Sequence, residues 1–170
     1  MMSFYKVVRM CHCRISSFLD NLPDNVNVAT THLFGHYYAV TELSQVIEYN
    51  PQTLETLQHI DLTDIHQGLI SMTVHPLYDS DGTYWNMGTL YRFSDMIANG
   101  GSVFAHVIMK ISPPKTKQEK KNPWLSLEIV AKIPSPHWMS IPYTHSFFMT
   151  ENYLVLPHQP VATASIPDFH

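Results

Sequence analysis

Two histidines with similar surroundings carry the chemistry that this sequence suggests. His75 lies in the segment MTVHPLYD, which a turn joins to YWNMGT, and His145 lies in YTHSFFMTENY. Each histidine therefore stands at the start of a predicted strand-turn-strand unit. Neutral imidazole is the commonest protein ligand for mid-row transition metals, and histidines from separate strands can converge on one ion. The pattern predicts a shared metal site; the alternative is that each ring bonds ordinary backbone groups.

The elements that must position these histidines are predicted to be short β-strands. Runs rich in valine, threonine and aromatic residues, separated by turn signals such as Asn50-Pro51, indicate four strands near residues 25–33, 37–42, 45–49 and 57–62. Four short strands in about forty residues are the size of one blade of a β-propeller. The first part of the chain is therefore predicted to form one such sheet.

The same unit recurs along the chain. His32 and His75 are 43 residues apart, which matches a blade repeat of roughly 40–50 residues, whereas His75 and His145 are 70 apart. The longer interval is explained by a lysine-rich insertion bounded by prolines, which is predicted to be an exposed, mobile loop. This insertion covers residues 112–123 and lies between two strands, at 102–111 and 124–133, that are predicted to pair. Turns are predicted at 79–82 and 100–101. The only helical signal is at 7–21, a segment that is either helical or irregular.

Composition narrows the class of protein. The 170 residues carry a formal net charge of −4, which gives no basic footprint for nucleic acid. Aromatic residues make up 12% and charged residues only 14%, which favours a β-rich protein with much covered surface. No apolar run approaches the ~18 residues of a membrane span, and the N-terminus does not resemble a signal peptide. Cys11 and Cys13 form no disulfide framework and lack the second pair of a zinc site, so a reducing, cytoplasmic location is expected.

Three ordered motifs resemble the carotenoid cleavage oxygenases. Thr-x-His-Pro followed by Asn-x-Gly-Thr spans residues 73–89, and His-Ser-Phe followed by Met-Thr-Glu-Asn-Tyr spans 145–153. The segment NPQTLETL at 50–57 resembles the animal branch, which includes beta-carotene oxygenases and the retinoid isomerase of the visual cycle. The resemblance implies an all-β fold made of about three blades of a seven-bladed β-propeller. Residues 1–22 would be an N-terminal extension, and 23–170 a partial oxygenase domain.

The resemblance also implies a site and an activity. His75 and His145 would be two of four histidines that hold a non-haem Fe(II) on the propeller axis. Glu42, in the motif YYAVTE, would accept the N–H of an iron histidine and so fix its tautomer. The implied reaction is that of a dioxygenase, an oxidoreductase that uses O2 to cleave a double bond of a carotenoid or retinoid substrate. Peripheral membrane contact, oligomeric state and the choice between cleavage and isomerisation stay open.

The sequence departs from the family pattern at Leu77, where many relatives carry a second histidine that is not a ligand, and at Phe148 and Pro157. Phe148 stands where relatives carry glycine, and a bulky side chain there is expected to crowd the metal or the substrate tunnel. Pro157 is expected to remove a hydrogen bond from a strand. Because about three blades and two of the four histidines are present, the chain is interpreted as a fragment of an oxygenase that is inactive alone. The alternative is a non-catalytic propeller piece that acts as a binding or interaction module through its open strand edges.

Overall fold

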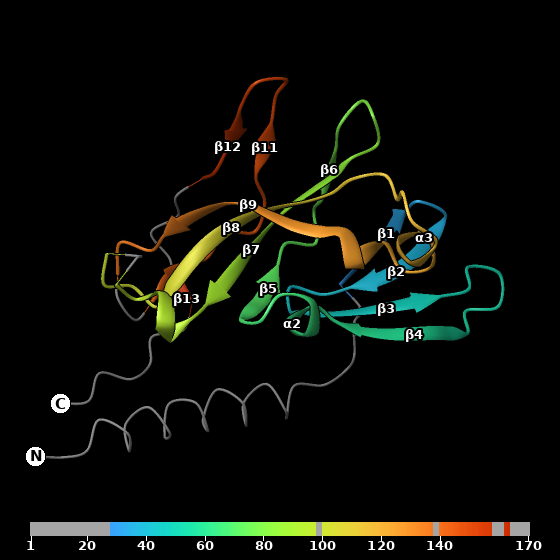
Figure 1. Cartoon of the computed structure of the whole chain (residues 1–170), viewed down its shortest axis with the longest axis horizontal. Helices are drawn as coiled ribbons and strands as arrows, with labels where there is room; N and C mark the ends of the chain where they lie inside the picture. The colour runs from blue at the N-terminus through green and yellow to red at the C-terminus, as the bar shows by residue number, and fades with distance from the viewer. Residues whose placement is uncertain (1–27, 98–99, 138–139, 158–161, 164–170) are drawn as a thin grey trace, which may run out of the picture.

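The chain is built from antiparallel β-sheets, as the sequence predicts. The structure is a computed structural model that describes residues 28–97, 100–137, 140–157 and 162–163 (Figure 1). Within these ranges strands predominate and the helices are short. The all-β class is therefore confirmed. The predicted N-terminal extension at 1–22, with its helical or irregular segment at 7–21, lies outside the described residues.

The first sheet contains the four strands that the sequence predicts between residues 25 and 62. They lie side by side in chain order: β1 (Ala29–Leu33), β2 (His36–Val40), β3 (Gln45–Tyr49) and β4 (Thr56–Asp61). Phe34 and Gly35 both have positive φ, at 49° and 94°, which is the geometry of a two-residue hairpin turn. The predicted turn at Asn50 is also present, because the Asn50 side chain accepts from the N–H groups of Gln52 and Thr53. The residues at these two turns therefore determine where the strands of this sheet begin and end.

The second sheet follows in the chain and has five strands: β5 (Leu69–Met72), β6 (Leu77–Tyr78), β7 (Tyr84–Tyr91), β8 (Phe104–Ile111) and β9 (Leu127–Pro134). Their order is β5-β7-β8-β9, and β6 pairs with β7 beside β5. The predicted turns at Asp79–Gly82 and Gly100–Gly101 are present. Gly88 is required in β7, because a Cβ there would collide with the carbonyl oxygen of Ser71 in β5.

One apolar core joins the two sheets. It contains Val40 and Val46 from the first sheet together with Leu90 and Val107 from the second. Trp124 is fully buried between them, and its ring lies 5.7 Å from that of Tyr38 and 5.7 Å from that of Tyr84, edge to face in both cases. Edge-to-face aromatic contacts of this kind add to the stability gained from burial. The two sheets are therefore packed as one body.

Two sequence predictions about the 112–126 region are wrong. The partner strand of β8 was expected to begin at Trp124, but Trp124 lies in a 3-10 helix, η2 (Pro123–Ser126), and β9 begins after it. The insertion was expected to be an exposed, mobile loop; it is mostly exposed, as predicted, but it contains a helix, α3 (Lys117–Lys121). Thr116 and Glu119 form a capping box that satisfies the free N–H groups at the start of this helix, which periodicity over a few residues cannot reveal.

Two single-turn helices and two short strand pairs complete the described part of the chain. Helix α2 (Leu62–Ile65) and the 3-10 helix η1 (Phe93–Asp95) contradict the expectation that the only helical signal lies near the N-terminus. Both are single turns, too short to show a helical period in the sequence. The last segments form two strand pairs, of β10 (Ile141–Pro142) with β13 (Ala162–Thr163) and of β11 (Phe148–Met149) with β12 (Leu154–Val155). No described helix is long and apolar enough to cross a membrane.

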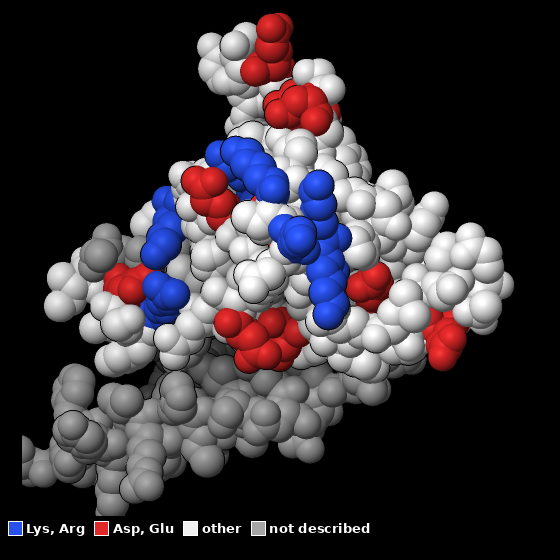
Figure 2. All heavy atoms as spheres, turned by 45° about the vertical axis from the view of Figure 1, so that its right-hand side comes forward, with Lys and Arg blue, Asp and Glu red and all other residues white. Residues whose placement is uncertain are grey.

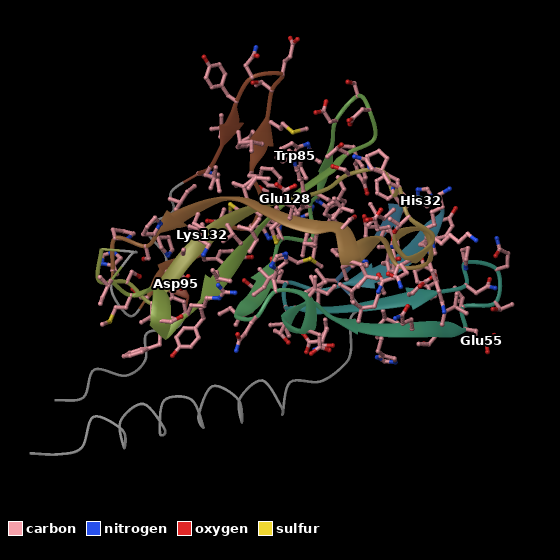
Figure 3. The ribbon with its side chains drawn as sticks, viewed as in Figure 1. His32, Glu55, Trp85, Asp95, Glu128 and Lys132 are labelled. Carbon is pink, nitrogen blue, oxygen red and sulfur yellow. The ribbon has the colours of Figure 1, made fainter. Side chains whose placement is uncertain are left out.

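Two turns project from the same side of the molecule, those between β6 and β7 and between β11 and β12 (Figure 1). Acidic side chains lie at the tips of the projections and basic ones gather on the face below them (Figure 2). Two ion pairs join described lysines to carboxylates, Lys110 to Glu128 at 3.2 Å and Lys132 to Asp95 at 3.1 Å. The second pair joins η1 to β9 (Figure 3). Acidic side chains also lie among the basic ones on the face seen in Figure 2.

Candidate metal centre

The structure brings His75 and His145 together at the base of the two projecting turns. Their Nε2 atoms are 2.8 Å apart, and their ring centroids are 4.5 Å apart at an interplanar angle of 66°. Both side chains are exposed on one side, with 48% of the His145 side chain accessible to solvent. Two residues separated by 70 positions thus present the same ring nitrogen to one point.

A bulge in the second sheet presents His75. Met72 at the end of β5 pairs with Gly88, and Leu77 at the start of β6 pairs with Trp85. The four residues 73–76 therefore stand opposite only two residues of β7. Extra residues on one strand bend it and re-aim its side chains. Because Val74 turns inward and is only 5% exposed, His75 is carried outward.

Apolar anchors on both sides hold the segment that carries His145. Ile141 is 4% exposed and packs with Val103 and Phe104. Phe147 is 3% exposed and packs against Met87 and Ile108 on the face of β7 and β8. The five residues between these anchors leave His145 little freedom to move away from the sheet. Its position is therefore set by the apolar residues that flank it.

Glu42 and Tyr143 contact His145 on the ring nitrogen that faces away from His75. Glu42, two residues past β2, places Oε1 2.9 Å from His145 Nδ1. The Tyr143 hydroxyl donates to the same Glu42 oxygen at 2.7 Å and lies 3.0 Å from His145 Nδ1. The Glu42 hydrogen bond, partial burial and the Glu42 charge raise the pKa of Tyr143 to about 12. Tyr143 thus keeps its proton at neutral pH and donates a hydrogen bond to Glu42.

This arrangement assigns the proton of His145. A carboxylate only accepts hydrogen bonds, so the neutral ring of His145 carries its proton on Nδ1, toward Glu42. Its Nε2 then presents a lone pair toward His75. Without a metal, the 2.8 Å contact between the two Nε2 atoms is a hydrogen bond, so His75 must carry a proton on its Nε2 and donate it to the lone pair of His145. A carboxylate behind an imidazole is the arrangement that orients metal-binding histidines and raises their basicity.

The residues present fit part of a metal centre. Adjacent ligands of one ion, each about 2.1 Å from it and roughly at right angles, lie about 3 Å apart, close to the separation of the two Nε2 atoms. Among the described residues, however, no group of three or more histidine, cysteine, aspartate or glutamate side chains could hold an ion. A cavity of about 230 Å³ is lined by Glu42, Thr73, Gly88, Tyr143 and others, and neither histidine of the pair lines it. Further ligands would have to approach the exposed side of the histidine pair.

Not every feature singled out in the sequence reaches this site. His32, whose spacing suggested the repeat, lies in the first sheet with its ring 4.8 Å from that of Tyr37 (Figure 3). Phe148 is 61% exposed, so the expected crowding of the metal is not found among the described residues. Pro157 follows β12 and does not interrupt it. Cys11 and Cys13 lie outside the described residues.

Tyr143 was missed by the sequence prediction. A weak signal existed, because residues two apart on an extended segment point to the same side, and Tyr143 is two residues before His145. That spacing could not reveal Glu42, which is 101 positions from Tyr143 and which gives the hydroxyl its partner.

Paired imidazoles backed by a carboxylate on an all-β framework fit the class of non-haem metal proteins. The chain matches the family described as retinal pigment epithelial membrane protein over residues 3–168. It is similar to "Beta,beta-carotene 15,15'-dioxygenase" of Homo sapiens, with 32% identity over 146 residues. The proteins of the same name from Rattus norvegicus and Gallus gallus are 33% and 34% identical to this chain over 146 residues. The chain belongs to this family, that of the carotenoid cleavage oxygenases, as the motifs predict.

The matches differ in how much of each protein they cover. They include 86% of this chain but only 26% of the human and chicken relatives and 25% of the rat relative. The chain therefore spans about a quarter of the length of the curated relatives that it matches.

Proposed function

We propose that these residues form part of the metal centre of a carotenoid oxygenase, with His75 and His145 as ligands of Fe(II). The observation that carries the proposal is the convergence of the two Nε2 atoms, 2.8 Å apart, with Glu42 behind one ring. Imidazole suits iron among several transition metals, and family membership favours iron over zinc or copper. Fe(II), when bound, would supply the chemistry that brings dioxygen to a conjugated double bond.

The chain's own residues would position the metal and exclude water. Glu42 would hold the Nδ1 proton of His145, and Tyr143 would hold Glu42 in turn. The apolar cluster beneath the histidines, which includes Leu77, Trp85 and Leu154, would offer a water-poor surface to a long polyene. A carotenoid or retinoid substrate is consistent with this surface and with the printed names of the relatives. A reducing, cytoplasmic setting is part of the same proposal and rests only on the two cysteines.

We also propose that the two large sheets are neighbouring blades of a seven-bladed β-propeller, with residues 140–157 beginning a third. Support comes from the size of each sheet, from strand order that follows the chain in the first sheet and nearly so in the second, and from family membership. In this arrangement β5 would lie nearest the axis and β9 at the rim. Further blades would supply the remaining metal ligands.

The experiment is a chimera in which this chain replaces the matching quarter of the human relative. We expect the chimera to bind Fe(II) and to convert beta-carotene to cleavage products that chromatography separates. His75→Ala and His145→Ala should each abolish both properties, whereas His59→Ala, at an exposed position of β4, should leave both unchanged. Full iron binding in the His75→Ala and His145→Ala chimeras would contradict the assignment.

A further inference from the structure

We infer that Asn86 is a positioning residue, whose side-chain amide holds open the bulge that presents His75 to His145. The inference rests on the proposed function, because it concerns the same histidine pair. Asn86 lies in β7 and is fully buried. Its neighbours on that face of the strand, Tyr84, Gly88 and Leu90, pack in the core or against β5. A polar side chain in such a place is unfavourable unless all its groups are bonded.

All four hydrogen-bonding positions of the Asn86 amide are used. Oδ1 accepts from the Thr73 hydroxyl at 2.7 Å and from the Met87 backbone N–H at 2.7 Å. Nδ2 donates to the Thr73 carbonyl at 2.8 Å and to the Tyr84 hydroxyl at 2.8 Å. An amide has two donors and two acceptor sites, so no capacity is left over.

The amide takes the place of a ladder bond. The Thr73 N–H donates to the Met87 carbonyl at 2.8 Å, as one half of an antiparallel pair would. In a regular ladder the Met87 N–H would donate back to the Thr73 carbonyl. Here Asn86 stands between those two groups, accepting from Met87 and donating to Thr73. The sheet is thereby held open where the four-residue bulge begins, with no backbone group of this pair left unbonded.

Thr73 transmits this constraint to His75. Its hydroxyl donates to Asn86 and also accepts from the His75 backbone N–H, at 3.3 Å. The position of the His75 backbone is thus tied through one hydroxyl to the fully buried amide. Leucine at position 86 would fill similar space, but it would leave the Thr73 carbonyl and the Met87 N–H unbonded. The strand could satisfy them by closing the ladder, and His75 would then turn away from His145.

The test compares Asn86→Leu with wild type in the complete 170-residue chain. Histidine-labelled protein without metal would be examined by 15N NMR, with signals assigned through His75→Gln and His145→Gln. Co(II), as a spectroscopic probe, would then be titrated. We expect Asn86→Leu to shift the ring signals of both histidines and to weaken Co(II) binding roughly 10- to 100-fold, the usual effect of losing a group that orients a ligand. Leu90→Ala, on the same face of β7, is the control for lost stability and should change neither readout.

A second pair of variants covers the case in which Asn86→Leu does not fold. Thr73→Val removes the hydroxyl that reaches His75 and should reproduce both effects, and Thr73→Ser, which keeps the hydroxyl, should restore wild-type behaviour. Unchanged histidine signals in Asn86→Leu, or in Thr73→Val, would overturn the inference. If wild type does not bind Co(II) while its histidine signals still respond to these variants, the positioning role stands. The proposed metal centre is then judged by iron binding in the chimera, so the two proposals can fail separately.

Discussion

At the scale of single residues, the site depends on side chains with two partners each. Glu42 accepts from Tyr143 and faces His145 Nδ1, and Thr73 donates to Asn86 and accepts from His75. His75, His145 and Glu42 could be selected from the sequence because they lie in recognisable motifs. The roles of Tyr143 and Asn86 could not be predicted, because each depends on contacts made across strands. A polar residue in a strand pattern does not reveal its partners.

The contribution of Glu42 can be measured with one substitution. Glu42→Gln removes the charge that holds the Nδ1 proton of His145, so iron retention by the chimera should fall roughly 10- to 100-fold. Retention would be measured with a colorimetric Fe(II) chelator after gel filtration. Glu55→Gln, in the exposed turn before β4 (Figure 3), is the matched control and should retain iron as wild type does. Equal retention in Glu42→Gln would show that Glu42 does not act through His145.

At the scale of elements, the two adjacent phenylalanines that follow His145 have opposite environments. Phe147 is 3% exposed and packs on β7 and β8, whereas Phe148 is 61% exposed in β11. The hairpin that follows His145 is therefore attached to the second sheet through one of two adjacent rings. The sequence predicted the hairpin but not which ring is buried, because alternation in a two-residue strand is too short to read.

The two rings should differ sharply when they are removed. Phe147→Ala is expected to lower the free energy of unfolding by about 3 kcal/mol, at the lower end for a buried phenylalanine. Phe148→Ala is expected to change it by less than about 0.5 kcal/mol, as for other surface positions. Urea unfolding followed by tryptophan fluorescence would measure both values. Similar losses in the two variants would contradict the packing described for the hairpin.

Helix α3 is attached to the first sheet by His36. Its Nδ1 lies 2.7 Å from Glu48 Oε1 and its Nε2 lies 2.9 Å from the Lys120 carbonyl oxygen. Both partners are acceptors, so the ring donates from both nitrogens only when it is protonated. Burial alone lowers the pKa of His36, but the hydrogen bonds to Glu48 and Lys120 and the Glu48 charge outweigh it. The pKa is raised above its ordinary value of 6.5.

The raised pKa sets the sign of a pH dependence. The folded state binds the proton more tightly than the unfolded state, so the stabilisation is fully present below pH 6.5 and is lost as pH rises through the folded pKa. Between pH 6 and a pH above the folded pKa, wild type should lose about 0.5–1 kcal/mol more than His36→Gln does. Urea unfolding at several pH values would measure the free energy of unfolding of both proteins. The other histidines are the same in both, so their contributions cancel in the difference between wild type and His36→Gln. An equal loss of stability in both proteins would show that protonated His36 does not hold α3 to the first sheet.

At the scale of the whole molecule, the described residues form two packed sheets with exposed surfaces. Most of β4 and most of β9 are exposed, and the histidine pair is open on one side. Strand edges of this kind pair readily with other strands, either of the same protein or of another chain. Two imidazoles also hold an ion weakly compared with a full set of ligands. The proposed propeller would cover these strand edges and complete the set of ligands.

The 170-residue chain by itself should therefore show no carotenoid cleavage. Purified chain would be mixed with Fe(II) and beta-carotene in detergent under air, and products sought by chromatography. The reason is that weak iron binding and an open site leave the polyene without a shaped, dry cavity. The double variant His75→Ala with His145→Ala is the control. Iron-dependent products above that control would show that the missing ligands are recruited from elsewhere, for example from a second copy of the chain.

The sequence alone determined the β-class, the turns and the histidine motifs, because these depend on residues near one another in the chain. Asn50 bonds its own turn, the Phe34-Gly35 pair sets a hairpin, and His75 and His145 lie in contiguous motifs. Only the tertiary structure decided that Trp124 fills the core between the sheets, that His36 holds α3, and that an amide in β7 opens the ladder beside His75. Each of these contacts joins residues from different parts of the fold. Their geometry follows from register and packing, which local sequence patterns do not specify.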